Sequence, residues 1–162
     1  MSQIYSATYS SEIGLVEVTA TDAAIKSLYF VEQAGPDSAA LPPVLQDCLA
    51  QLDEYFRGTR REFSLVLEPE GTTFQQKVWK QLRAIPYGKT ASYLEIAQAI
   101  GNPKAVRAVG AANGANPISI IIPCHRVIGT NGKLTGYGGG LWRKEWLLDH
   151  EGWQPHPQLS LF

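Results

Sequence analysis

The alternation of apolar and polar positions in the first 70 residues predicts a small sheet and a helix. Residues 14–18 alternate and residues 24–31 form an apolar run, and the Thr-Asp pair between them predicts a turn joining two strands. Residues 34–43 are rich in proline and small side chains, which is typical of a loop. Apolar residues recur at helical spacing over residues 44–56, and residues 63–67 predict another strand.

The composition changes at residues 68–71, where we place a domain boundary, and helix-capping signals follow it. Thr73 with Gln76 and Ser92 with Glu95 have the spacing of a capping box, in which two side chains satisfy free amides at a helix start. We therefore expect one helix to begin at each of these positions.

The short helix opened by Ser92 stops at Gly101, and another helix follows it closely. Asn102 is a favourable N-cap and Pro103 is favoured at a first helical position, so we expect this next helix over residues 104–113. Two short helices joined by a tight turn suggest a helix-turn-helix, although helical hairpins are also common in proteins that never bind DNA.

An apolar run over residues 118–123 predicts a buried extended segment that leads to Cys124. After it, residues 131–132 predict a turn, and the glycine-rich residues 136–140 predict a flexible or closely approached loop. A last helix is expected over residues 141–151.

Cys124 is the candidate nucleophile, because it ends a rigid apolar segment and precedes His125 and Arg126, which favour a thiolate. A lone cysteine is more often a packing residue, and Cys48, on the apolar face of the helix over residues 44–56, is assigned to the core. Adjacent residues of a strand point to opposite faces. His125 therefore reaches Cys124 only if the chain turns there or a water bridges the two side chains.

The composition of the chain excludes several classes of protein. Of the 162 residues 44% are hydrophobic, which is too apolar for a disordered chain. Two cysteines and three histidines fit neither a disulfide scaffold nor a metal finger, and we expect no metal and no cofactor. No apolar run is long enough to span a membrane and no secretory signal is readable, so we expect a cytoplasmic protein without a membrane partner.

The net charge of −1 conceals two oppositely charged segments. Residues 1–70 hold four basic and eleven acidic side chains, a net charge of −7, whereas residues 71–162 hold ten basic and four acidic ones, a net charge of +6. Such asymmetry indicates a nucleic-acid surface on the basic segment.

The segment NPISIIIPCHRV over residues 116–127 resembles the active-site signature of the bacterial-type O6-alkylguanine-DNA alkyltransferases, or methylated-DNA-protein-cysteine S-methyltransferases. The similarity extends through GTTFQQKVWKQLRAIPYGKTASY, GNPKAVRAVG and GYGGGLWRKEWLLDHEG, and so covers residues 71–152. It implies an α/β (α+β) protein with a ribonuclease-H-like domain over residues 1–70 and a winged-helix-like domain with a helix-turn-helix over residues 71–152. Residues 153–162 are expected to form a flexible tail.

The resemblance also implies an activity and its residues. Cys124 would accept the alkyl group of O6-alkylguanine, or of O4-alkylthymine, from a flipped base in the minor groove of duplex DNA, and would be consumed. His125 would activate the thiol through a water, with Glu151 orienting the histidine and Asn116 bracing the turn. Tyr93 would donate to guanine N3. Arg107 would fill the space of the flipped nucleotide, and further substrate or DNA contacts would come from Tyr137, Gly138, Val127, Lys104 and Ser92.

The final pentapeptide QLSLF, Gln158–Phe162, resembles the segment by which bacterial repair and replication proteins bind the sliding clamp. Its apolar residues could instead fold back onto the domain. We expect the protein itself to be a monomer.

Three other functions compete with alkyl transfer. A damage-binding relative would flip the base without transfer, but such proteins lack the cysteine. A helix-turn-helix regulator would leave Cys124 unreactive. A cysteine hydrolase using Cys124, His125 and Asn116 would need direct contact between nucleophile and base, which adjacent residues rarely make.

Overall fold

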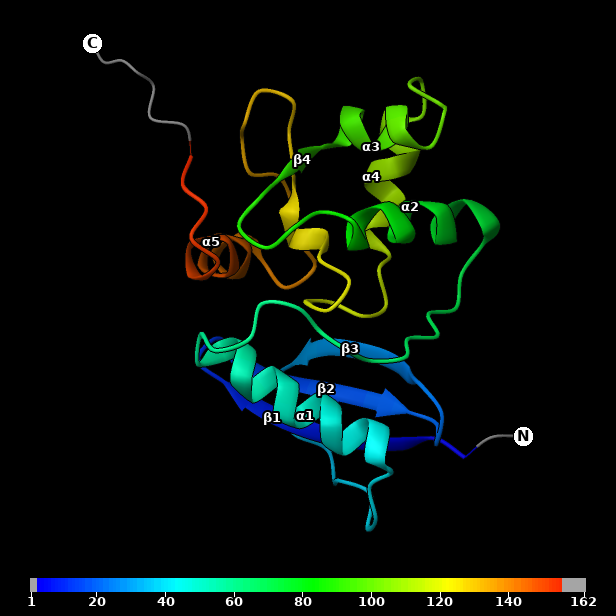
Figure 1. The fold of residues 1–162 in the computed structure, drawn as a ribbon, viewed down its shortest axis with the longest axis vertical. Coiled ribbons are helices and arrows are strands. Elements are labelled where there is room, and N and C mark those ends of the chain that lie inside the picture. Colours follow the sequence, from blue (N-terminus) through cyan, green and yellow to red (C-terminus); the bar gives the residue numbers. More distant parts are fainter. Residues whose placement is uncertain (1–2, 156–162) are drawn as a thin grey trace. The chain divides into compact units, whose positions relative to one another are not determined.

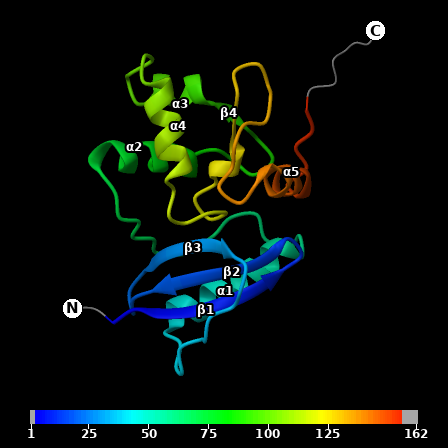
Figure 2. The same cartoon turned by 180° about the vertical axis from the view of Figure 1, so that it is seen from behind.

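The computed structural model describes residues 3–155, which form two compact units. The first unit comprises the chain up to Glu70 together with Pro117–Ile121, and the second comprises Gly71–Asn116 and the chain from Ile122 onward. Figures 1 and 2 show the elements of each unit from opposite sides. The expected clamp-binding segment, Gln158–Phe162, lies outside the described residues.

The first unit is an antiparallel sheet covered by one helix. Strands β1 (Tyr5–Ser11), β2 (Gly14–Ala20) and β3 (Ile25–Val31) pair in the order β1-β2-β3. Helix α1 (Pro43–Phe56) runs along one face of this sheet (Figure 1). Alternate residues of β2 are buried, as expected for a sheet with one covered face. Its fully buried side chains include Val16, Val18, Leu28, Leu45, Cys48, Leu52 and Tyr55, which confirms Cys48 as a core residue.

Two details of this sheet differ from the prediction. The sequence pattern does not predict β1, whose residues YSATYSS carry few large apolar side chains, yet β1 pairs with β2 along its whole length. Residues 63–67, predicted as a strand, make only an isolated parallel bridge from Leu67 to Ile25. The Gln51 side chain of α1 holds this segment, accepting from the Ser64 amide at 2.9 Å and donating to the Ser64 carbonyl at 3.2 Å. A side-chain amide thus satisfies backbone groups that a strand would pair.

The second unit is built from short helices around a two-stranded parallel pair. Its elements are α2 (Thr73–Arg83), β4 (Ala91–Ser92), α3 (Tyr93–Ala99), α4 (Val106–Gly114), β5 (Val127–Ile128) and α5 (Leu141–His150). Helix α2 packs against α3 and α4, and the buried Trp79 indole donates to the carbonyl of Ala112 at 2.8 Å. No helix within residues 3–155 is long and apolar enough to cross a membrane.

The two capping boxes occur, one of them shifted by a residue. Ser92 and Glu95 form the predicted box at the start of α3. At α2 the N-cap is Thr72, paired with Gln75, and not Thr73 with Gln76. The repeated Thr-Thr and Gln-Gln pairs allow either register by sequence. The structure selects the earlier one, in which Gly71 lies so close to the Trp79 ring that a Cβ on residue 71 would overlap it.

The turn between α3 and α4 also differs from the prediction. Helix α3 ends with Gly101 at φ +80°, and the amide of Asn102 donates back to the carbonyl of Ala97 at 2.9 Å. Asn102 is therefore part of the preceding helix end and does not cap α4. The Ala105 amide donates to the Asn102 carbonyl, which closes a turn, and α4 begins only at Val106.

Candidate active site

The apolar run over residues 118–123 forms tight turns and not the predicted extended segment. Only Ile118 makes a strand-like contact, an isolated parallel bridge to Leu28. The Ile121 amide donates to the Ser119 carbonyl at 2.8 Å around Ile120, whose φ is +70°. A β-branched residue pays a steric cost in this left-handed region, so burial of the isoleucines must hold the turn.

A second tight turn comes directly before the candidate nucleophile. The Cys124 amide donates to the Ile122 carbonyl at 2.8 Å around Pro123, whose φ of −81° and ψ of 66° are those of an inverse γ-turn. The buried Asn116 side chain donates to the same Ile122 carbonyl at 2.8 Å, and the Asn113 side chain donates to the Cys124 carbonyl at 3.4 Å. These amides fix the backbone that presents the Cys124 thiol, which is buried at 6% exposure.

Cys124, His125 and Arg126 form a single turn of 3-10 helix, so the chain does turn at the nucleophile. His125 is fully buried, and its Nε2 lies 2.8 Å from Oε2 of Glu151, the residue that ends α5. Arg126 binds the same carboxylate at both oxygens, with Nε to Oε1 at 2.8 Å and Nη2 to Oε2 at 3.0 Å. Its Nη1 donates to the Ile85 carbonyl at 2.7 Å. Sequence reasoning assigned no such role to Arg126.

The protonation states follow from this geometry. Burial alone raises the pKa of Glu151, but the charges and hydrogen bonds of His125 and Arg126 outweigh it and hold the pKa below its usual range. Burial lowers the pKa of His125, and the Glu151 carboxylate opposes this only in part. A neutral His125 must donate from Nε2 to the carboxylate, which leaves Nδ1 as an acceptor. This buried Nδ1 has no hydrogen-bond partner within the described chain, so it is available as a base.

Lys144 of α5 is a buried cation close to this turn, and sequence reasoning missed it. Its Nζ donates to the Val127 carbonyl at 2.6 Å and to the Thr135 carbonyl at 3.1 Å. Burial lowers its pKa to about 8, against the attraction of Cys124. Lys144 precedes the inward-facing Leu147 and Leu148 by one helical turn, and this spacing places it on the buried face of α5.

The Cys124 thiol is neutral at rest in this setting. Burial raises its pKa, and a hydrogen bond from Asn116 and the charge of Lys144 lower it only in part. A buried neutral thiol can become a thiolate when a proton path connects it to the unoccupied Nδ1 of His125. The chemistry available is therefore nucleophilic attack by sulfur.

Two family models match almost the whole described chain. Residues 4–69 match the 6-O-methylguanine DNA methyltransferase, ribonuclease-like domain, and residues 73–153 match the 6-O-methylguanine DNA methyltransferase, DNA binding domain. The chain belongs to this family. It is 47% identical over 159 residues to a methylated-DNA–protein-cysteine methyltransferase of Mycolicibacterium paratuberculosis, and the match covers 96% of each chain.

Solved structures give the same assignment. A crystal structure of the Mycobacterium tuberculosis O6-methylguanine methyltransferase matches with a TM-score of 0.83 at 46% identity, over 95% of this chain and 96% of that one. The Mycobacterium tuberculosis OGT in complex with DNA matches with a TM-score of 0.82 at 50% identity, over 89% and 90% of the two chains. The expected α/β fold class, with a sheet domain followed by a helical domain, is confirmed.

The remaining predicted site residues of this family member lie around α3, α4 and the glycine-rich loop. Tyr93 begins α3 and is half-buried, with its hydroxyl 2.6 Å from Thr135 Oγ1. Ser92 uses its hydroxyl to accept from the Glu95 amide. The other five differ in exposure: Val127 is buried, Tyr137 is half-buried, and Lys104, Arg107 and Gly138 are exposed.

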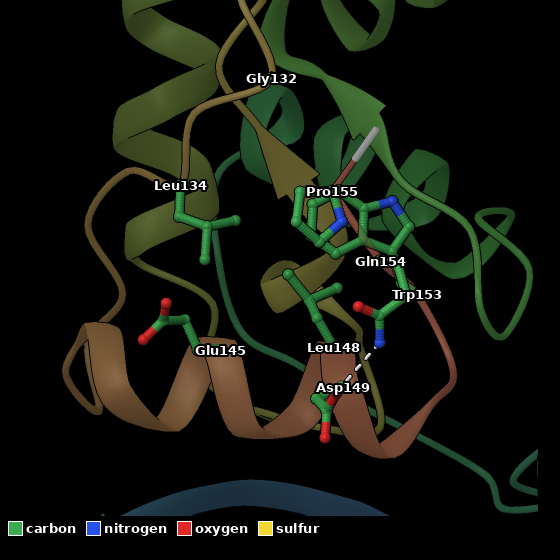
Figure 3. Close-up of a pocket in the computed structure, with 8 residues that line it drawn as sticks. All are labelled: Gly132, Leu134, Glu145, Leu148, Asp149, Trp153, Gln154 and Pro155. Carbon is green, nitrogen blue, oxygen red and sulfur yellow. Dashed lines mark hydrogen bonds between the residues drawn. The ribbon is translucent and has the colours of Figure 1, made fainter. Parts of the chain in front are cut away.

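A separate pocket of about 260 Å³ lies between α5 and the chain that follows it (Figure 3). Its lining residues are Gly132, Leu134, Glu145, Leu148, Asp149, Trp153, Gln154 and Pro155, none of which is a predicted site residue. Glu145 and Asp149 place two carboxylates at this pocket, which disfavours the binding of phosphate there. Within residues 3–155 no group of three or more His, Cys, Asp or Glu side chains is arranged to hold a metal ion.

Proposed function

We propose that this protein repairs O6-alkylguanine in duplex DNA by transferring the alkyl group irreversibly to Cys124. The observation that carries the proposal is the buried His125, whose Nε2 is held by the Glu151 carboxylate at 2.8 Å while its Nδ1 remains unoccupied beside the turn that presents the cysteine. Membership of the methyltransferase family supports the same chemistry.

The transfer step follows from these side chains. The Cys124 thiol passes its proton through a bridging water to Nδ1 of His125, and Glu151 stabilises the resulting imidazolium. The sulfur attacks the alkyl carbon as the carbon–oxygen bond breaks, and the electron pair of that bond stays on the guanine. The released proton finally neutralises the guanine. Because a thioether has no easy route to hydrolysis, each molecule reacts once.

Other residues act on the base and the DNA in this proposal. Asn116 braces the turn before Cys124, in keeping with its hydrogen bond to the Ile122 carbonyl. Tyr93 donates to guanine N3 as negative charge develops on the leaving group. Arg107, exposed on α4, occupies the space of the flipped nucleotide. Backbone or surface contacts to the substrate or DNA come from Val127, Tyr137, Gly138, Lys104 and Ser92.

The proposed partner surface is the basic segment of the chain. Residues 71–152 form the proposed domain that carries the alkyl acceptor, and the helix-turn-helix of α3 and α4 enters the minor groove. Residues 1–70 form a separate acidic domain with no assigned contact to DNA. We propose that the protein acts as a monomer and that the range of lesions includes O4-alkylthymine.

Methyl transfer can be measured directly. Incubation with duplex DNA carrying O6-methylguanine should place one methyl group on Cys124, found by peptide mass, and should yield an equal amount of repaired guanine. Cys124→Ser should abolish transfer, while Cys48→Ser, at the other buried cysteine, should leave its stoichiometry unchanged. Multiple turnovers would show a hydrolase, and binding without modification would show a damage sensor; either result contradicts the proposal.

A second partner is proposed for the end of the chain. Residues Gln158–Phe162, which lie outside the described part of the structure, would bind a bacterial sliding clamp through their apolar side chains. Deleting these five residues should abolish retention of the protein on immobilised clamp without changing methyl transfer. Unchanged retention would contradict clamp binding through these five residues.

A further inference from the structure

Thr135 lies in the segment between β5 and the glycine-rich loop, and its side chain meets that of Tyr93. The two hydroxyl oxygens are 2.6 Å apart, and either can be the donor. Tyr93 is the first residue of α3, so this contact links the loop segment to the start of the helix-turn-helix. None of the roles described above for the site uses Thr135.

The backbone carbonyl of Thr135 accepts a hydrogen bond from the core. The buried Lys144 donates to the carbonyls of Thr135 and Val127. Val127 in turn pairs with Ala91 in the parallel strands, and Ala91 stands two residues before Tyr93. The ammonium group of Lys144 therefore binds Thr135 directly. It also binds Val127, whose strand pairs with the strand that leads to Tyr93.

The two branches of the Thr135 side chain have different neighbours. Its methyl carbon lies over Gly129, 3.6 Å from the position that a Cβ would take there. The methyl branch of Thr135 thus lies on the side of Gly129, and its hydroxyl branch lies at hydrogen-bond distance from Tyr93.

We propose that Thr135 is a positioning residue that donates its hydroxyl hydrogen to the Tyr93 oxygen. The phenol has one hydrogen, and a phenol that donates to Thr135 cannot donate to the base. With Thr135 as the donor, the Tyr93 hydrogen stays free and points toward guanine N3, and the chain of two hydrogen bonds polarises it. This inference rests on the proposed function and on the role of Tyr93 within it.

The first test removes the hydroxyl group of Thr135 and keeps the shape of its side chain. Thr135→Val should slow single-turnover methyl transfer at saturating DNA about fivefold, since one hydrogen bond to a reacting group is lost, while DNA affinity stays unchanged. Thr135→Ser should restore most of the rate. Thr130→Val, at an exposed threonine of the same segment, is the matched control and should have no effect. Thermal unfolding of each variant separates a folding defect from a loss of positioning.

The second test changes the acceptor on the base. With O6-methyl-3-deazaguanine in the duplex, a C–H group replaces N3, and Thr135→Val should then cost nothing further. The same loss on both bases would show that Thr135 only supports the loop, and no loss on the natural base would show that it does not position Tyr93; either result overturns the inference. If the wild-type protein transferred no methyl group even from O6-methylguanine, the proposed function itself would fail.

Discussion

At the scale of single residues, Glu151 is the side chain of the site that depends most on its charged and hydrogen-bonding partners. Its carboxylate is fully buried and meets two positively charged or polarised partners, Arg126 at both oxygens and His125 at one. Burial of such a group is tolerated only while every partner is present. Stability and chemistry are therefore coupled through one side chain.

Glu151→Gln should reduce both the stability of the protein and the rate of methyl transfer. The amide cannot balance the buried Arg126 guanidinium or stabilise an imidazolium, so we expect a loss of about 3 kcal/mol in the free energy of unfolding. Methyl transfer should slow about 100-fold, because His125 becomes a weaker base. Urea unfolding and single-turnover kinetics measure the two effects. Asp149→Asn, at an exposed carboxylate of the same helix, is the control and should change neither.

The pH dependence of unfolding checks the same position. The depressed pKa of Glu151 gives stability that is full above the unfolded value of about 4.3 and is lost as the pH falls through the folded value. The depressed pKa of His125 likewise removes stability as the pH falls below about 6.5, since the unfolded chain then binds the extra proton. In Glu151→Gln the steep loss below about pH 4.3 should be weaker. An unaltered profile would contradict the ionised state of Glu151.

At the scale of elements, local signals predict the start of α3 correctly and the start of α2 within one residue, but they give the wrong N-cap for α4 and miss the turns before Cys124. The Ser92–Glu95 box is a short-range hydrogen-bond pattern that needs no tertiary contact, and it occurs as predicted. The start of α2 is ambiguous by sequence because the Thr-Thr and Gln-Gln pairs allow two registers, and the structure has the box formed by Thr72 and Gln75. The isoleucine run before Cys124 has high strand propensity, yet it folds into turns because burial outweighs the local preference of Ile120.

Charged residues of the site were the hardest to predict. Arg126 and Lys144 lie in the interior, where charged side chains are rare unless they are paired. Arg126 pairs with a carboxylate 25 residues away, and Lys144 donates to carbonyl groups of a separate segment. No sequence pattern indicates that these groups lie close together in the fold. The resemblance named Cys124, His125 and Glu151, and the structure adds the hydrogen bonds that hold them.

At the scale of the whole molecule, the charge is divided between the two parts of the sequence. The segment that carries Tyr93, Arg107 and Cys124 has a net charge of +6, and residues 1–70 have a net charge of −7. A protein with this division should bind DNA through a limited set of phosphate contacts, with an affinity that falls as salt rises. The net charge of −1 says little about that affinity.

Binding to undamaged duplex DNA at several salt concentrations tests this division. Lys104→Gln should weaken binding and should lower the slope of log affinity against log salt by about one, as expected when one phosphate contact is lost. Lys26→Gln removes the same charge from the acidic segment, where Lys26 pairs with Glu68 and Glu70, and should leave the slope unchanged. Equal effects of the two substitutions would show that only the total charge matters.

The left-handed Ile120 has a consequence for where reactivity resides. A free peptide with the sequence of residues 118–126 would relax this residue to ordinary backbone angles, because nothing would bury its side chain. The peptide would carry the thiol, the imidazole and the guanidinium in the right order without their arrangement. The arrangement that lets His125 serve as the base for Cys124 is thus a property of the folded chain, and unfolding removes it while leaving an ordinary exposed thiol.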